Sequence, residues 1–183
     1  MRIVSSDGRD LPDYEIGEII IQGDSLFEGY YNRPDLTLAA VKDGWYWTGD
    51  LGFLVNGELF VSGRKNDLII VGGKNIYPQD IEEIVCRHPA IHDGRAVALA
   101  LYNDDQGTEE IFVAAELNNW KDADKSLEIE CVLRNAVLRE LGVAPRAIFL
   151  KPPAWIVKST AGKPARSTTR EKLLNEHPEL RQG

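Results

Sequence analysis

A short segment near the end of the chain combines residue types that can act on an anionic substrate. It reads VKSTAGKPAR from Val157 to Arg166, and it places Lys163 after Gly162 among small and polar residues. A lysine on such a loop is a compact positive charge on a long stem, which suits contact with a phosphate or a carboxylate. The alternative is a solvated surface loop, the usual state of segments rich in Gly, Lys and Pro.

The same segment is not a P-loop. That pattern requires Gly five residues before the Gly-Lys pair and Ser or Thr after it. Here Val157 stands in the first place and Pro164 in the second. A self-contained phosphate cradle is therefore absent, and the segment offers a polar arm that carries a cation.

A second candidate site lies in GWYWTGD, from Gly44 to Asp50. Gly49 permits a tight turn that aims the Asp50 carboxylate outward. A carboxylate only accepts hydrogen bonds, so it can take two from the vicinal hydroxyls of a ribose. The alternative is an aspartate in a β-turn behind core aromatics.

A third candidate site is GRKNDLIIVGGKNIYPQDIE, from Gly63 to Glu82. Arg64 carries a donor fork that can contact a ribose or a phosphate. Gly72 and Gly73 allow the backbone to come close to a ligand. The alternative is a basic turn followed by a glycine-rich hairpin.

The elements that must position these residues change in character along the chain. Asn56-Gly57, between two apolar runs, predicts a β-hairpin. Residues after Arg64 alternate strand and helix patterns, including a helix that starts near Pro78. We expect an α+β fold, with a small β-rich segment over 1–63 and a small α/β domain over 64–183. The expected strands are 18–23, 52–63, 67–73, 95–102, 110–117 and 146–150, and the three expected helices are 78–88, 126–141 and 167–177.

Composition limits the class of protein. The 183 residues are 43% hydrophobic and 27% charged, as in ordinary globular proteins, and the formal net charge is -8. A negative chain is repelled by nucleic acid and by anionic membranes, so we expect neither as a general partner. Cys86 and Cys131 form no metal-binding spacing. No apolar run is long enough to span a membrane, the first ten residues do not resemble a signal peptide, and we expect a cytoplasmic protein.

In this order, the three motifs resemble the C-terminal region of the acyl-adenylate-forming superfamily. That superfamily includes acyl-CoA synthetases, fatty-acyl-AMP ligases and the adenylation domains of peptide synthetases. WYWTGD resembles its ribose-binding motif, the stretch from Gly63 to Glu82 resembles the motif that crosses its interdomain hinge, and VKSTAGKPAR resembles its lysine segment. The resemblance covers nearly the whole chain, and within the superfamily it is greatest to the fatty-acyl-AMP ligases.

The resemblance implies an activity and a ligand set. It implies an AMP-forming ligase that uses ATP with Mg²⁺ to convert a fatty acid or another carboxylic acid into an acyl-adenylate. The acyl group then passes to a thiol, either on an acyl carrier protein or on CoA. Lys163 is the implied catalytic residue, and Asp50 and Arg64 are the implied nucleotide-binding residues.

The resemblance also implies movement of one domain against another. Lys65 and Asn66 occupy the implied hinge, and Gly72, Gly73 and Lys74 form the implied loop beside the path of the thiol. Residues 1–63 would be the tail of a large N-terminal adenylation domain, and 64–183 the mobile C-terminal domain. That large domain would hold most of the ATP site, so we expect the chain alone to be inactive.

Three positions depart from the usual family pattern. Val157 stands where Pro is common, Ser159 where Thr is common, and Asn66 where Asp or Lys is common. Ser159 keeps the hydroxyl that Thr would supply. Asn66 is compatible with a hinge, because Asn tolerates unusual backbone angles.

Two other functions remain open from the sequence. One is a non-catalytic binding module that recognises an acyl carrier protein or a ligase partner. The other is a structural α/β domain in which the ordered motifs are a coincidence. We favour the ligase because Asp50, Arg64 and Lys163 are all present.

Overall fold

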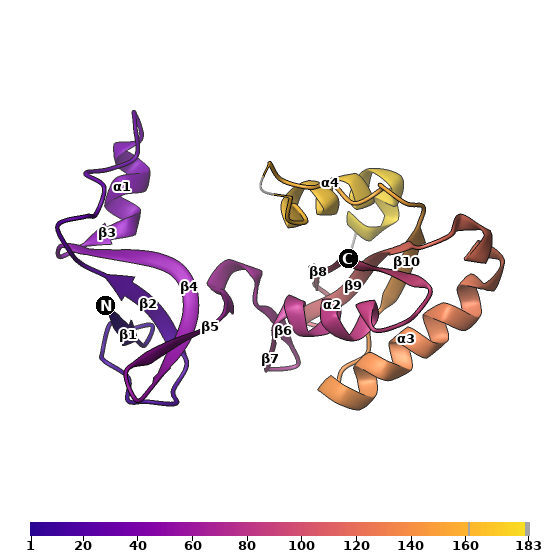
Figure 1. Cartoon of the computed structure of the whole chain (residues 1–183), viewed down its shortest axis with the longest axis horizontal. Coiled ribbons are helices and arrows are strands. Elements are labelled where there is room, and N and C mark those ends of the chain that lie inside the picture. The colour runs from indigo at the N-terminus through magenta and orange to yellow at the C-terminus, as the bar shows by residue number, and fades with distance from the viewer. Residues whose placement is uncertain (161, 182–183) are drawn as a thin grey trace. The chain divides into compact units, whose positions relative to one another are not determined.

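The structure is a computed structural model that describes residues 1–160 and 162–181 (Figure 1). The chain forms two compact units, Met1–Leu68 and Ile69–Gly183. The division follows Leu68, five residues after the expected boundary at Gly63, so the segment from Arg64 to Leu68 belongs to the first unit. Whether the first unit is the tail of a larger domain stays a prediction.

The first unit is a five-stranded sheet with one short helix. Its long central strand β4 pairs with β3 at its start, with β2 from Tyr46 to Gly52 and with β5 from Asp50 to Val55, and β1 pairs with β2. Its elements are β1 (Arg2–Val4), β2 (Gly17–Ile21), α1 (Pro34–Ala40), β3 (Val41–Lys42), β4 (Trp45–Val55), β5 (Glu58–Arg64) and the 3₁₀ turn η1 (Lys65–Asp67).

The hairpin between β4 and β5 confirms the turn expected at Asn56-Gly57. Both residues have positive φ, 51° and 84°, which is the backbone of a type I′ turn. Helix α1 was not expected. It begins with Pro34 in its first turn, where the missing N–H of proline costs nothing.

The second unit is a small α/β domain. Its elements are β6 (Ile69–Val71), β7 (Lys74–Ile76), α2 (Pro78–Cys86), β8 (Ile91–Asn103), β9 (Thr108–Leu117), η2 (Trp120–Lys125), α3 (Ser126–Leu141), β10 (Ala147–Lys151), α4 (Arg166–Glu176) and η3 (Pro178–Arg181). β8 and β9 pair antiparallel, whereas β10 runs parallel to β9. Parallel neighbours need a long crossover, which α3 supplies.

Both faces of this three-stranded sheet are covered. On one face α2 and α3 bury apolar side chains such as Ile81, Leu133 and Val137 against the strands. On the other face lie Trp155, Ile156 and the helix α4, and Figure 1 shows α3 and α4 on opposite sides of the strands. This mixed architecture confirms the expected α+β class. Gly142 ends α3 with a φ of 68°, directly after the apolar residues that recur every fourth position of this helix, Ile129, Leu133, Val137 and Leu141.

Two further properties concern the described residues as a set. None of the helices in 1–160 and 162–181 combines the length and the apolar composition that a bilayer-spanning helix needs. Cys86 and Cys131 are both free thiols.

Candidate active site

Asp50 and Arg64 lie opposite each other on β4 and β5. From the two-residue turn the strands pair regularly as far as Gly52 and Val61, and the register then shifts by one residue at Ser62. This β-bulge brings Arg64, rather than Gly63, across from Asp50. The Arg64 Nε lies 3.2 Å from Asp50 Oδ1, and the side chains are 70% and 36% exposed. The two predicted nucleotide-binding residues therefore form one polar pair.

The residues before Asp50 fix the direction of its backbone. The Thr48 hydroxyl donates a 2.8 Å hydrogen bond to the carbonyl of Ile19 and accepts a 3.0 Å bond from the Asp50 N–H. Gly49 between them has a φ of 74°, a conformation that strains any residue with a Cβ. In the Thr-Gly-Asp motif, Thr48 and Gly49 thus hold the strand while Asp50 presents its carboxylate.

A cavity of about 550 Å³ opens in the same unit, beside Thr48 and Gly49. At its edge Lys65 Nζ lies 2.7 Å from an oxygen of the nearly buried Glu18. The hydrogen bond between the Tyr30 and Tyr46 hydroxyls, 3.1 Å long, raises the pKa of the Tyr46 phenol, which also lines this cavity. Lys65, one of the two predicted hinge residues, is therefore tied to the first unit.

The predicted thiol-path loop is the turn between β6 and β7. Gly72 and Gly73 have φ of 55° and 81°, and a Cβ on either would meet no atom within 4 Å. Glycine is thus required here by backbone conformation. The Gly72 N–H donates a 2.9 Å bond to the Thr108 hydroxyl, which connects the turn to β9. Lys74 Nζ lies 3.2 Å from where a Cβ on Gly142 would be, at the carboxyl end of α3.

The lysine segment forms a tight hairpin. Its arms are joined by backbone hydrogen bonds from Ala165 N–H to the Val157 carbonyl and from Ser159 N–H to the Lys163 carbonyl, each 2.8 Å long. Lys163 is exposed, and no hydrogen bond or ion pair reaches its ammonium from any described residue. A second lysine, Lys158, lies in the same hairpin, where it pairs with Pro164.

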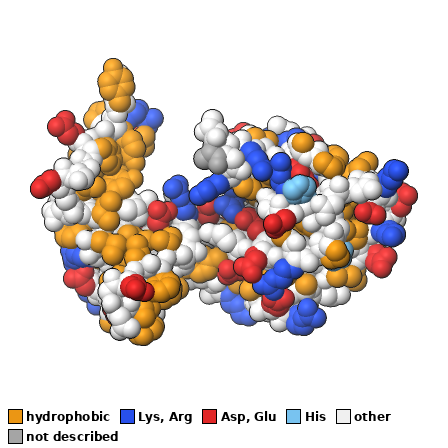
Figure 2. Space-filling view, in the orientation of Figure 1, with side chains coloured by type: hydrophobic (Ala, Val, Ile, Leu, Met, Phe, Trp, Pro, Cys, Tyr) orange, Lys and Arg blue, Asp and Glu red, His pale blue; other side chains and the backbone are white. Residues whose placement is uncertain are grey.

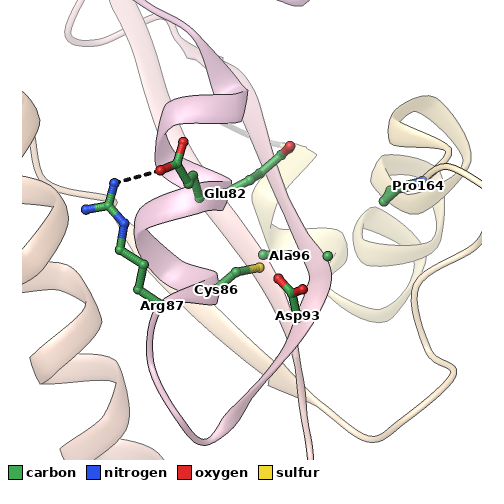
Figure 3. Close-up of a pocket in the computed structure, with 8 residues that line it drawn as sticks. Glu82, Cys86, Arg87, Asp93, Ala96 and Pro164 are labelled. Carbon is green, nitrogen blue, oxygen red and sulfur yellow. Dashed lines mark hydrogen bonds and ion pairs between the residues drawn. The ribbon is translucent and has the colours of Figure 1, made fainter.

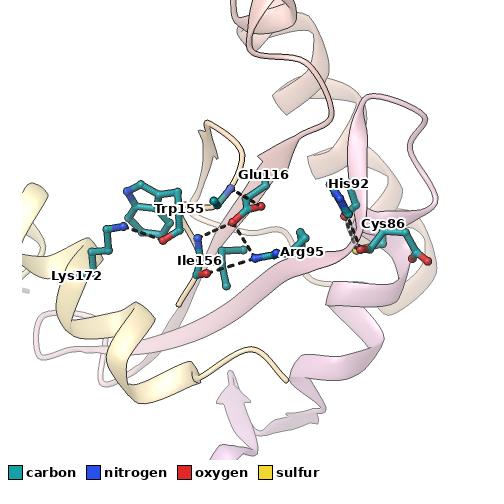
Figure 4. A network of polar contacts seen from close by, with 9 residues as sticks. Cys86, His92, Arg95, Glu116, Trp155, Ile156 and Lys172 are labelled. Carbon is teal, nitrogen blue, oxygen red and sulfur yellow. Dashed lines mark hydrogen bonds and ion pairs between the residues drawn. The ribbon is translucent and has the colours of Figure 1, made fainter. Parts of the chain in front are cut away.

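A buried carboxylate holds the beginning of this hairpin, and the sequence analysis did not identify it. Glu116 on β9 is 1% exposed and accepts hydrogen bonds from the N–H groups of Ala154 and Ile156, at 3.0 and 2.6 Å (Figure 4). Arg95 lies 3.4 Å from both Glu116 and the Ile156 carbonyl. Glu116 ends the apolar run IFVAAE, and nothing near it in sequence signals this role.

The far end of the hairpin is also held. Arg166, the first residue of α4, donates to Glu82 on α2 at 2.6 Å and to the Ala98 carbonyl on β8 at 3.2 Å. A cavity of about 450 Å³ lies beside this contact, with Pro164 across from Cys86 (Figure 3). Burial raises the pKa of the Cys86 thiol, so it is a poor nucleophile at neutral pH.

The structure thus gathers the predicted residues into two groups. Asp50, Arg64, Lys65 and Asn66 belong to the first unit, whereas the glycine turn and Lys163 belong to the second. Within the described ranges, no three His, Cys, Asp or Glu side chains gather as a metal site would require.

Comparison with known proteins gives a consistent class. The chain is 38% identical over 176 residues to the sulfoacetate–CoA ligase of Cupriavidus necator, covering 95% of this chain and 32% of that protein. No protein-family model matches the chain. It spans about a third of the length of the curated relatives it matches.

Solved structures agree with this result. McyG A-PCP complexed with phenylalanyl-adenylate matches with a TM-score of 0.85 and 27% identity, covering 99% of this chain and 33% of that one. A structure from a study of the fatty acyl-adenylate ligases of E. coli and L. pneumophila matches with 0.80 and 34%, covering 97% and 31%. ATP-bound MatB from Rhodopseudomonas palustris matches with 0.77 and 25%, covering 93% and 33%.

The fold and these comparisons are consistent with a C-terminal domain of the adenylate-forming class. The chain belongs to the acyl-adenylate-forming superfamily.

Proposed function

We propose that the chain is the C-terminal portion of an ATP-dependent ligase that activates a carboxylic acid as its acyl-adenylate and passes the acyl group to a thiol. One observation carries the proposal. In a chain of this superfamily, Lys163 presents an ammonium that has no partner among the described residues, in a hairpin whose two ends are fixed. A surface lysine with no function would need no such support.

Lys163 would act while the adenylate forms. In this step a carboxylate must approach the α-phosphate, so two negative groups come together. A cation placed near both offsets that repulsion and stabilises the charge that grows in the transition state. Lysine suits the task because its charge is compact and its stem is long.

Asp50 and Arg64 would orient the nucleotide. Arg64 engages one oxygen of the Asp50 carboxylate, and the second oxygen has no partner among the described residues. A carboxylate with an oxygen still available can accept hydrogen bonds from a ribose, because both neighbouring ribose hydroxyls are donors. The exposed guanidinium can reach the ribose or a phosphate with its remaining donors. Mg²⁺ and most of the contacts to ATP would come from the N-terminal adenylation domain.

The junction at Lys65 and Asn66 would serve as the hinge. We propose that the second unit turns about it, so that Lys163 serves adenylate formation and the Gly72, Gly73 and Lys74 turn serves thiol transfer. The ion pair of Lys65 with Glu18 supports a fixed near side of this hinge, with the rotation at Asn66 or beyond it.

The first unit would pack against the N-terminal adenylation domain. Eleven of its large hydrophobic side chains are exposed, among them Tyr31 at 92% and Leu38 at 77%, and Figure 2 shows such side chains across this unit. A contiguous exposed apolar surface marks a protein interface.

A fatty acid is the substrate we favour, because the stretch from Thr48 to Glu82 resembles the fatty-acyl-AMP ligases and one such ligase structure is 34% identical. The acceptor of the acyl group would be an acyl carrier protein or CoA, and the 38% identity to a CoA ligase supports CoA as one of these two candidates. The second candidate function is a non-catalytic module that recognises a carrier protein or a ligase partner. Such a module would not need an exposed lysine held at this position for catalysis.

The test is a pair of lysine substitutions in the complete ligase. Lys163→Ala should slow acyl-adenylate formation about a hundred- to thousand-fold, or roughly 2.7–4 kcal/mol, as loss of one placed charge contact does. Thiol transfer from a pre-made acyl-adenylate should be largely spared. ATP–pyrophosphate exchange measures the first step, and thioester formation measures the second.

Lys158→Ala is the matched control, because Lys158 is also an exposed lysine of the same hairpin. It should leave both steps nearly unchanged. Equal and mild effects of the two substitutions would show that the hairpin is a solvated charge patch.

A further inference from the structure

The buried carboxylate of Glu116 lies at the root of the Lys163 hairpin, between the apolar neighbours Ala115 and Leu117 of β9. We propose that Glu116 is a positioning residue that fixes this hairpin in the second unit, so that Lys163 is delivered at a set place. The inference rests on the proposed function for its catalytic consequence, but the anchoring itself is a property of this chain alone.

Both oxygens of Glu116 are used on one short segment. Oε2 accepts from the Ala154 N–H at 3.0 Å, and Oε1 accepts from the Ile156 N–H at 2.6 Å. Arg95 completes the contact by donating to Oε1 and to the Ile156 carbonyl, both at 3.4 Å. The segment lies outside every strand and helix, so Glu116 replaces the partners that a sheet would supply.

Burying the Glu116 carboxylate costs free energy, which indicates that this residue has a specific role. Neighbouring positions of β9 are Ala, Val and Leu, and a buried carboxylate is unfavourable unless it is paired and hydrogen-bonded. An apolar residue at Glu116 would satisfy the sheet but would leave two backbone N–H groups of the hairpin root without acceptors. The carboxylate therefore serves the hairpin rather than the strand.

The anchor is transmitted to Lys163 through the backbone. Ile156 is 3% exposed, packed among Val97, Leu99 and Leu173, and the next residue, Val157, accepts the hydrogen bond that closes the hairpin from Ala165. A second closing bond joins Ser159 to Lys163 itself. Fixing Ile156 thus fixes both arms. A misplacement of about 1 Å at a reacting group can cost about a hundred-fold in rate.

Hydrogen exchange on the 183-residue chain tests the anchor without any assay of activity. Glu116→Gln keeps the shape, but its NH₂ group must face one of the two backbone donors. We expect the Ala154 and Ile156 amides to exchange at least about tenfold faster, with the amides of β8 and β9 unchanged. Glu110→Gln is the control, since Glu110 lies on the same strand and also faces an arginine, Arg146, at 3.7 Å.

Two results would overturn the anchor. One is unchanged exchange at Ala154 and Ile156, and the other is an equal rise across the sheet, which would make Glu116 a general stabiliser. If Glu116→Gln does not fold, Arg95→Lys removes the forked contact and keeps the charge. It should accelerate exchange at Ile156 but not at Ala154, and no acceleration at Ile156 would also contradict the proposal.

The catalytic consequence is measured in the complete ligase. Glu116→Gln should lower kcat for adenylate formation about ten- to a hundred-fold with an unchanged KM for the acid, and should spare thiol transfer from a pre-made adenylate. Equal loss in both steps would contradict the positioning role. If Lys163→Ala has no effect, the proposed function fails. If Lys163→Ala is crippling and Glu116→Gln is harmless, only the positioning role fails.

Discussion

The two units of the chain differ sharply in how they use hydrophobic side chains. In the first, four are buried as a core: Ile3, Val4, Ile19 and Ile20. In the described part of the second, 26 are buried, on both faces of the sheet. The proportions reverse at the surface, where eleven large hydrophobic side chains are exposed in the first unit and six in the described part of the second.

This difference shows what each unit can do by itself. Burial of apolar surface is the main favourable term in folding, at about 25 cal/mol per Å². The second unit buries enough to hold the Lys163 hairpin on a rigid frame. The first unit brings Asp50 and Arg64 together through backbone pairing, yet it leaves much apolar surface exposed.

The largest expected effect is on independent folding. A fragment of residues 69–183 should unfold cooperatively in urea, because its core is complete. A fragment of residues 1–68 should show no cooperative transition, since small domains with few buried side chains are marginal. Circular dichroism across a urea titration measures both. A sharp transition from the first fragment, or none from the second, would contradict the comparison.

A pair of leucine substitutions sharpens the same comparison at single positions. Leu133 in α3 is 1% exposed, so Leu133→Ala should lower the free energy of unfolding of its unit by about 2–5 kcal/mol. Leu38 in α1 is 77% exposed, so Leu38→Ala should change stability by less than about 0.5 kcal/mol. Urea unfolding followed by hydrogen exchange assigns each loss to its unit, and similar losses would refute the contrast.

The smallest expected effect is a pH dependence. Burial opposes ionisation of Glu176, but hydrogen bonds from Lys151 and from the Trp155 indole outweigh it and lower the Glu176 pKa below its ordinary 4.5. A lowered pKa means that the stabilisation is present above about pH 4.5 and is lost as the pH falls through the native value.

Glu176→Gln checks this sign by removing the titrating group. The wild type should be more stable than the variant at pH 7, and the difference should shrink as urea unfolding is repeated toward pH 3. Asp10→Asn is the control from the first unit, where the Arg2 partner lowers the pKa of a fully exposed carboxyl. A stability difference for Glu176→Gln that stays constant with pH would exclude this linkage.

Local signals in the sequence were enough for most elements. Asn56-Gly57 predicts the hairpin, and Pro78 predicts the start of α2. The four-residue spacing of Ile129, Leu133 and Val137 predicts the buried apolar face of α3. Each signal acts within a few residues, through turn geometry or helical period.

Other features depend on contacts that local signals do not report. The pairing of Asp50 with Arg64 requires the β-bulge at Ser62, and the turn residues do not predict this bulge. The parallel pairing of β10 with β9 is set by the crossover of α3. Glu116 acts on residues almost forty positions away, so in the sequence it resembles only a polar end of an apolar strand.

The most direct test of the account is ATP–pyrophosphate exchange with a panel of fatty acids, comparing the 183-residue chain with the complete ligase. The account assigns to this chain a lysine that works in a site formed mainly by other residues. It therefore predicts exchange by the complete ligase, loss of that exchange on Lys163→Ala, and none from the chain alone. Robust exchange by the chain alone would contradict it.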